Sequence, residues 1–192
     1  MDLLPTFLKL SGRRVLVVGG GAVAASKLEA LRGAGAKVTV VAPDVRPAIR
    51  DAGVDVEERA FRSSDLDHAW FVIAAATPAV NREVAREAER RRIFVNAVDD
   101  PPNASAYLGG VVRRAGVTIA ISTNGDAPAL AGVLRESLDA VLPADLDRWT
   151  ECARRIRRQW KAEGVPMAER RPRLLEALID LYPAADKTRA AS

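Results

Sequence analysis

Reactive and metal-binding side chains are scarce in this sequence: cysteine and histidine occur once each among its 192 residues. Cys152 alone cannot form an internal disulfide, and the two residues together are too few for a zinc site. His68 lies just ahead of an apolar run that predicts a buried strand, at the sheet edge opposite a ligand crevice. We therefore expect His68 to be a surface or packing residue, and we predict neither a serine–histidine triad nor metal ligands.

Long apolar stretches and aromatic side chains are also lacking. No apolar run approaches the roughly 20 residues that cross a bilayer, and the first residues lack the charged start and apolar core of a signal peptide. We therefore predict a cytoplasmic protein that does not enter a membrane. Aromatic residues make up only 5% of the chain, so the arginine-rich stretch 148–173 has few rings to stack on bases, and nucleic acid is not an expected partner. A solvated helix face and a pocket for a polyanionic small molecule are the two interpretations of this stretch.

Glycine, by contrast, is concentrated at one place near the start of the chain. Gly19, Gly20 and Gly21 follow the apolar run Arg14–Val18 and precede a helix-forming segment. Together with Ala24 they form the G-x-G-x-x-A pattern of a dinucleotide-binding turn. In this pattern Gly19 permits the turn, Gly21 lets the backbone approach a pyrophosphate, and Ala24 lets the helix pack closely on the sheet. Free N–H groups at the start of the helix would bind the phosphates.

Strand-like and helix-like segments alternate over the first two thirds of the chain. We predict strands at 14–18, 37–42, 54–59, 70–76, 93–98 and 117–122, with helices at 22–31 and 81–91 and a short helical piece at 66–69. This alternation predicts an α/β fold, a Rossmann-type doubly wound parallel sheet. After Pro128 the pattern is helical, with predicted helices at 129–141, 146–163 and 170–181. This small helical tail is expected to pack on a partner subunit or to cover the ligand crevice.

The turns after the strands supply the candidate cofactor contacts. An acidic residue ordinarily ends the second strand of a dinucleotide fold and binds the adenosine ribose. Here two apolar residues occupy that place, and Pro43 and Asp44 follow them. We expect Pro43 and Asp44 to make this contact and favour NAD, while nearby Arg46 leaves NADP open as an alternative. Thr77, after the fourth strand, should face the same crevice.

Two carboxylates follow the fifth predicted strand. Asp99 and Asp100 stand ahead of two prolines at the crevice edge. The prolines restrict the path of the turn, so one carboxylate can be held toward the nicotinamide, and Asp99 is the better candidate because it follows the strand directly. Two aspartates that merely cap the turn are the alternative. Further polar candidates to line this edge are Ser105, Ser122, Thr123 and Asn124.

Several ordered motifs extend beyond the glycine turn. The first are Leu4-Pro5-x-Phe7-x-x-Leu10 and Val17-Val18-Gly19-Gly20-Gly21-x-Val23-Ala24-x-x-Lys27. Later ones are Gly35-Ala36-x-Val38-Thr39-Val40-Val41-Ala42-Pro43, Asn96-x-Val98-Asp99-Asp100-Pro101 and Ile121-Ser122-Thr123-x-Gly125. Together these motifs closely resemble the siroheme synthase family, the precorrin-2 dehydrogenase/sirohydrochlorin ferrochelatase proteins. The likeness spans most of residues 4–138, and ordered motifs at matching spacing are far more specific than one glycine turn.

The resemblance implies an NAD-dependent dehydrogenation of precorrin-2 to sirohydrochlorin, leading to siroheme or cobalamin. Insertion of Fe²⁺ or Co²⁺ into sirohydrochlorin is a further activity that the sequence leaves open. The resemblance also implies that Asp99 is the catalytic residue and that Ala22, Val23, Pro43 and Asp44 contact the dinucleotide. The alternative is a non-catalytic NAD-binding or tetrapyrrole-binding module, in which Asp99 only caps a turn.

Substrate recognition and assembly follow from the same resemblance. The tetrapyrrole carries carboxylates around its rim, so basic side chains should orient it. Arg113 and Arg114, with the cluster at 154–158, are the candidates. The family is typically a homodimer, and the resemblance implies the same for this chain. We predict an NAD-binding Rossmann domain at 1–112, a dimerisation segment at 113–146 and a helical C-terminal domain at 147–192.

Overall fold

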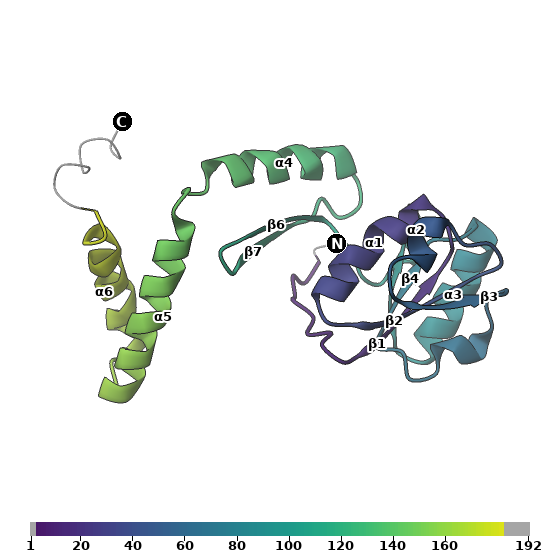
Figure 1. The fold of residues 1–192 in the computed structure, drawn as a ribbon, viewed down its shortest axis with the longest axis horizontal. Helices are drawn as coiled ribbons and strands as arrows, with labels where there is room; N and C mark the ends of the chain where they lie inside the picture. Colours follow the sequence, from purple (N-terminus) through teal and green to yellow (C-terminus); the bar gives the residue numbers. More distant parts are fainter. Residues whose placement is uncertain (1–2, 183–192) are drawn as a thin grey trace. The chain divides into compact units, whose positions relative to one another are not determined.

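The computed structural model describes residues 3–182, which form two compact units (Figure 1). The first unit comprises the chain up to Leu108 together with Asn124–Ala127, and the second comprises Gly109–Thr123 and the chain from Pro128 onward. The finer division at residues 112 and 146 stays a prediction. No helix within residues 3–182 has the length and apolar character needed to cross a membrane.

The core of the first unit is a five-stranded parallel sheet with the strand order β3-β2-β1-β4-β5. Its strands are β1 (Arg14–Val18), β2 (Lys37–Ala42), β3 (Asp55–Glu58), β4 (Phe71–Ala74) and β5 (Phe94–Ala97). Its helices are α1 (Ala22–Gly33), α2 (Pro47–Arg50) and α3 (Pro78–Arg90), with two 3₁₀ helices, η1 (Ser63–Leu66) and η2 (Pro101–Asn103). The direction of winding reverses between β1 and β4, so the carboxyl ends of these two strands mark the expected ligand crevice.

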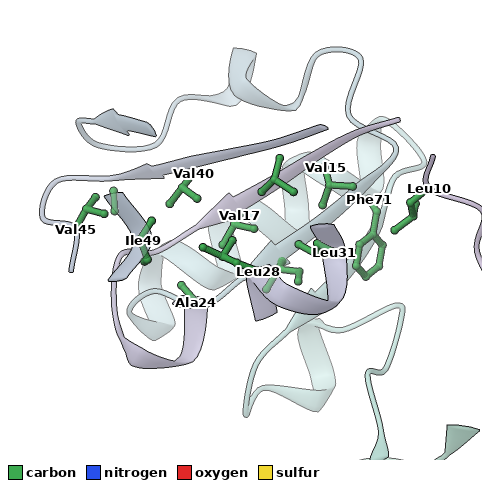
Figure 2. Close-up of a cluster of buried hydrophobic side chains, with 13 residues drawn as sticks. Leu10, Val15, Val17, Ala24, Leu28, Leu31, Val40, Val45, Ile49 and Phe71 are labelled. Carbon is green, nitrogen blue, oxygen red and sulfur yellow. The ribbon is translucent and has the colours of Figure 1, made fainter. Parts of the chain in front are cut away.

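Helices cover both faces of this sheet, because successive residues of a strand point to opposite sides. On one face Val17 and Phe71 pack with Leu28 of α1 (Figure 2). On the other face Leu16 packs with Val84 of α3. Each of these five side chains is at most 4% exposed, and burying a side chain of this size contributes about 2 kcal/mol. The predicted doubly wound α/β fold is confirmed.

The predicted element bounds are mostly close to the observed ones. β1 and β2 lie at the predicted residues. α3 begins at Pro78 rather than at Asn81, because proline is well suited to the first turn of a helix, where its missing N–H is not needed. The short helical piece lies at η1, earlier than predicted. It is held there by Asp65, whose carboxylate accepts a hydrogen bond from the Arg62 N–H at 2.8 Å.

The predicted sixth strand does not join the parallel sheet. Instead β7 (Val117–Ile121) pairs antiparallel with β6 (Gly110–Arg114), a strand that was not predicted. Ala115 and Gly116 connect the two with φ angles of 50° and 78°, the two positive values of a type I′ hairpin turn. A parallel connection needs a crossover of about a dozen residues, so this short link can only form a hairpin. The prediction of a sixth parallel strand is therefore wrong.

Helices make up the rest of the second unit. They are α4 (Pro128–Val141), α5 (Leu146–Glu163) and α6 (Met167–Ile179). α4 packs closely on β6, since a Cβ at Gly110 would lie 2.9 Å from the Ala131 carbonyl oxygen. α5 ends at Gly164, whose φ of 68° is typical of a helix-ending glycine. All three predicted helices are confirmed, although α6 begins at Met167 rather than at Arg170.

A partly buried ion pair stabilises the segment between β3 and β4. Arg59 donates to both carboxylate oxygens of Asp65, at 2.7 and 2.8 Å. Burial of the carboxyl group raises its pKa, but hydrogen bonds from the Arg59 side chain and the Arg62 N–H outweigh this effect. The pKa of Asp65 is therefore held below its ordinary value. A carboxyl whose pKa is lower in the folded state stabilises the fold above its unfolded pKa of about 3.9 and loses this contribution as the pH falls through the folded value.

We expect Asp65→Asn to lower the urea midpoint of unfolding near neutral pH, because the charge-assisted pair with Arg59 is lost. The difference from the parent should shrink once the pH falls below the folded-state pKa of Asp65, where the parent carboxyl is protonated too. Urea unfolding followed by circular dichroism over the acid range measures both effects. A difference that does not change with pH would contradict this assignment.

Candidate functional site

The glycine turn lies at the carboxyl end of β1, between the loops that follow β2 and β4. Gly19 has a φ of 130°, and a Cβ there would lie 2.2 Å from the Ala75 carbonyl oxygen. A Cβ at Gly20 would lie 1.9 Å from the Asp44 carbonyl oxygen, and the Arg46 N–H donates to the Gly20 carbonyl at 3.0 Å. The first two glycines are thus required by close contacts with neighbouring loops.

Gly21 has a different environment. A Cβ there would meet no atom within 4 Å, so open space adjoins its Cα. Gly21 is the N-cap residue of α1 and has no side chain that could cap the helix. The first N–H groups of a helix, here including those of Ala22 and Val23, have no intrahelical partners. Both residues are exposed, whereas Ala24 is fully buried against the sheet. Open glycine backbone, unpaired N–H donors and the positive end of the helix dipole fit a dinucleotide pyrophosphate.

The loops on either side of the turn carry the other predicted cofactor contacts. Pro43 and Asp44 are exposed beside it, and Thr77 is the exposed N-cap residue of α3. The loop after β4 is fixed by Asn81, whose Oδ1 accepts the Ala76 N–H at 3.0 Å from a side chain that is only 3% exposed. The sequence interpretation gave Asn81 no role. A polar residue at an otherwise apolar helix position was the signal that could have found it.

Asp99 lies at the same edge of the sheet as the glycine turn. Val98 donates its N–H to the carbonyl of Ala74, the last residue of β4, at 2.9 Å, and the carbonyl of the next residue, Ala75, borders Gly19. Asp99 is exposed and has a φ of 54°, a left-handed conformation that aspartate tolerates better than most residues. Within residues 3–182 the Asp99 carboxylate has no hydrogen-bond or ion-pair partner.

Asp100 differs from its neighbour. Both of its carboxylate oxygens accept from the Asn103 Nδ2, each at 2.9 Å. The Tyr107 hydroxyl donates to the Pro101 carbonyl at 3.2 Å, so the turn after Asp99 is tied at two points. Of the two aspartates, only Asp100 holds the turn, and Asp99 is left to face solvent.

Ser105 lies beside β5. Its hydroxyl accepts the Val95 N–H at 2.9 Å, and its own N–H donates to the Val95 carbonyl at 2.9 Å. The buried Asn96 amide reinforces this pairing by donating to the Ala106 carbonyl at 3.0 Å. The serine therefore extends the sheet edge, and its contact with a substrate stays a prediction.

The remaining predicted substrate contacts fall on the second unit or at its border. Arg113 is exposed on β6, whereas Arg114 is engaged with the Asp139 carboxylate at 2.7 Å and the Leu142 carbonyl at 3.2 Å. Arg154, of the 154–158 cluster, lies against the hairpin turn at Gly116. The polar residues after β7 are Ser122, Thr123 and Asn124. Their contacts with a substrate stay predictions.

No metal centre is found in the described part of the chain. Residues 3–182 contain no group of three or more histidine, cysteine, aspartate or glutamate side chains that could hold a metal ion. His68 is exposed ahead of β4, at the edge of the sheet away from the glycine turn.

Comparison with known proteins identifies the family. The family model "Putative NAD(P)-binding" matches residues 6–110, and "Sirohaem biosynthesis protein central" matches residues 114–140. Siroheme synthase 1 of Serratia proteamaculans is 42% identical over 176 residues, which cover 89% of this chain and 37% of that protein. The chain belongs to the siroheme synthase family. It carries the NAD(P)-binding domain of that family, so the predicted family and nucleotide-binding fold are confirmed.

Other siroheme synthases and a solved structure agree with this assignment. The siroheme synthase of Pseudomonas entomophila is 38% identical over 211 residues, which cover 95% of this chain and 46% of that protein. The chain thus spans less than half the length of these curated relatives. The structure of SirC, a precorrin-2 dehydrogenase, superposes with a TM-score of 0.73 and 26% identity, covering 94% of this chain and 92% of SirC.

Proposed function

We propose that this member of the siroheme synthase family is a precorrin-2 dehydrogenase that uses NAD and forms sirohydrochlorin. The observation that carries the proposal is the unpartnered Asp99 carboxylate at the same sheet edge as the open glycine turn. Similarity to SirC over nearly the whole of both chains supports it. The siroheme synthases match this chain over less than half of their own length, so they support the same role for the shared part.

The proposed reaction removes two electrons and two protons from the macrocycle. NAD supplies the hydride acceptor when it is bound, and a second hydrogen leaves the substrate as a proton. A carboxylate can accept that proton, and we assign this role to Asp99. The hydrogen bonds of Asp100 and of the Pro101 carbonyl, which hold the turn that follows it, support the assignment. The absence of a partner for Asp99 within residues 3–182 leaves its oxygens available to the substrate.

The choice of NAD over NADP rests on Asp44. Its carbonyl packs against Gly20, so this aspartate lies beside the glycine turn and just after β2, the part of a dinucleotide fold that binds the adenosine ribose. A carboxylate there favours ribose hydroxyl groups and repels a 2′-phosphate. We also infer a cytoplasmic location, which is supported by the sole cysteine being a buried free thiol.

Incubation of the purified chain with precorrin-2 and NAD under anaerobic conditions tests the dehydrogenase. We expect NADH and sirohydrochlorin to appear in equal amounts, and faster with NAD than with NADP. Failure to turn over, with NAD still bound, would favour the alternative of a non-catalytic binding module. A second reaction with sirohydrochlorin and Fe²⁺ or Co²⁺, without NAD, shows whether the chain also inserts metal.

We further propose that the chain forms a homodimer through α4. Leu130, Val133 and Leu134 stand at i, i+3 and i+4 and therefore form one stripe on the helix, and they are 50%, 58% and 40% exposed. Large exposed apolar patches on a folded domain mark interaction surfaces. A two-fold interface joins the same surface of both subunits, so such a stripe can pack on its own copy.

Replacing Val133 by aspartate should convert the dimer to monomer, because the interface would then bury two unpaired charges. Sedimentation velocity at matched concentrations measures the change. Ala79→Asp is the control, since it adds the same charge at an exposed position in the first turn of α3, away from the stripe, where a negative charge is favourable. A parent protein that sediments as a monomer at all concentrations would refute the dimer.

A further inference from the structure

A cleft lies at the amino-terminal edge of the sheet in the first unit, where β4 and β5 begin. Its volume is about 350 Å³, which falls in the lower part of the range for small-molecule sites, roughly 300–1,000 Å³. It is lined by Leu8, Lys9, Leu10, Ala69, Trp70, Arg91, Arg92, Ile93 and Phe94. This edge is opposite the carboxyl ends that carry the glycine turn and Asp99, so the cleft is separate from the nucleotide site.

The cleft presents two aromatic rings to solvent. Trp70 is 54% exposed and Phe94 is 56% exposed, although rings of this size contribute strongly to stability when they are covered. The Arg13 guanidinium stacks on the Trp70 ring, 3.6 Å from its centroid, which restrains the indole and adds positive charge beside the cleft. Flat exposed rings of this kind provide a stacking surface for another planar group.

The charge of the lining is entirely positive. Lys9, Arg91 and Arg92 contribute cations, and no acidic residue lines the cleft. Arg91 is already engaged by Glu87 at 3.1 Å and by Asp67 at 3.4 Å. Within residues 3–182 Lys9 and Arg92 have no ion-pair partner, so two cations are left to bind an anion next to the rings.

The backbone of Arg92 takes a left-handed conformation at the end of α3. Arg92 follows the C-cap of α3 with a φ of 57°, and its N–H donates to the Glu89 carbonyl at 3.0 Å, while that of Ile93 donates to the Ala88 carbonyl at 3.0 Å. This is a Schellman motif, in which glycine is the favoured residue at the left-handed position. Arginine is less favourable than glycine at this position, so a substitution by glycine can remove the side chain without disturbing the helix end.

We propose that this cleft binds a planar aromatic anion of nucleoside-monophosphate size, and that it is distinct from the dinucleotide-binding site at the glycine turn. The aromatic ring of the ligand stacks against Trp70 and Phe94, and its phosphate or carboxylate is bound by Lys9 and Arg92. Stacking of a base on an aromatic side chain and charge-assisted hydrogen bonds to a phosphate are both established contributions to binding. The site does not depend on the dehydrogenase activity proposed above.

Calorimetric titration of AMP into the full chain saturated with NAD tests the proposal, because NAD then occupies the dinucleotide-binding site at the glycine turn. We expect saturable binding with one site per chain, and much weaker binding of adenosine or inorganic phosphate alone. Failure of AMP to bind, or complete loss of its binding as NAD is raised, would overturn the proposal. Equal binding of phosphate and AMP would reduce the site to a simple anion site and would also overturn it.

Arg92→Gly separates a ligand-binding role from a structural one. Glycine relieves the left-handed strain, so the unfolding temperature should stay equal or rise, while AMP affinity should fall about tenfold or more with the lost charge-assisted bond. Arg32→Ala, which removes an exposed cation that does not line the cleft, should leave AMP affinity unchanged. Full AMP affinity in the Arg92→Gly protein would refute the assignment.

Discussion

Replacing Asp99 by asparagine should lower the rate of NADH formation from precorrin-2 by about 10²–10⁴-fold, the usual contribution of a positioned general base. Asparagine has nearly the same shape and tolerates the same left-handed backbone, so the fold and the affinity for NAD should not change. What is lost is the capacity to accept a proton. Stopped-flow absorbance of NADH under anaerobic conditions measures the rate. Calorimetry of NAD binding tests whether the dinucleotide-binding site is intact.

Asp100→Asn is the matched control for this prediction. It removes the same charge one residue away, from a side chain whose oxygens are already occupied by Asn103. We expect a loss of at most about tenfold, from a looser turn, because one side-chain hydrogen bond contributes about 1 kcal/mol. An Asp99→Asn protein that retains parental activity, or two variants with equal losses, would remove Asp99 from the proposed mechanism.

The second large effect is expected at Gly20. A Cβ at this position would lie 1.9 Å from the Asp44 carbonyl oxygen and 2.9 Å from the Val45 Cα. Both are backbone atoms, so the clash cannot be relieved by a side-chain rotation, and Val45 is itself buried. We expect Gly20→Ala to destabilise the fold by about 3 kcal/mol, at the upper end of overpacking effects, as measured by urea unfolding.

Gly21→Ala provides the contrast, because its Cβ would enter open space. It should leave the free energy of unfolding within about 0.5 kcal/mol of the parent value, as surface substitutions do, and weaken NAD binding by obstructing the backbone approach to the pyrophosphate. Equal destabilisation by the two substitutions would show that the third glycine is structural as well. Loss of NAD binding without loss of stability would identify Gly21 as the ligand contact.

The two kinds of glycine explain why this turn has three rather than two. Gly19 and Gly20 allow the loops after β4 and β2 to close against the end of β1. This closure brings Asp44 beside the turn, while the pairing of Val98 with β4 brings Asp99 to the same edge. The glycine pattern therefore positions residues far beyond itself in the sequence.

Much of the fold could be predicted because it depends on local patterns. Short β-branched runs such as Lys37–Ala42 favour strands, and the change from alternating to helical spacing locates α4 and α5. The hairpin was missed because its turn, Ala115-Gly116, lacks the usual asparagine or aspartate. The stretch before it, Gly110–Arg114, has two adjacent valines followed by two adjacent arginines, so its apolar and polar residues do not alternate as those of a half-buried strand do. Only its pairing with β7 makes it a strand.

The candidate site was predicted less completely, for a different reason. Asp99 was chosen over Asp100 from its position after a strand, but the sequence could not show that Asn103 engages only Asp100. The hydrogen bond of Asn81 was not predicted because its partner is a backbone N–H, which every residue but proline carries, so the sequence does not indicate which one it binds. Trp70 likewise belongs to the segment 70–76, which was predicted as a buried strand, although its ring is 54% exposed.

The sequence by itself determined that this chain builds a dinucleotide-binding α/β unit with a helical tail, and it identified the siroheme synthase family. These follow from residue order, since turn chemistry and periodicity act over a few neighbouring residues. Tertiary structure alone decided which glycine meets which carbonyl, which aspartate is left without a partner, and that the last predicted strand forms a hairpin. Each of these depends on atoms brought together from distant segments, and packing of the two sheet faces sets those distances.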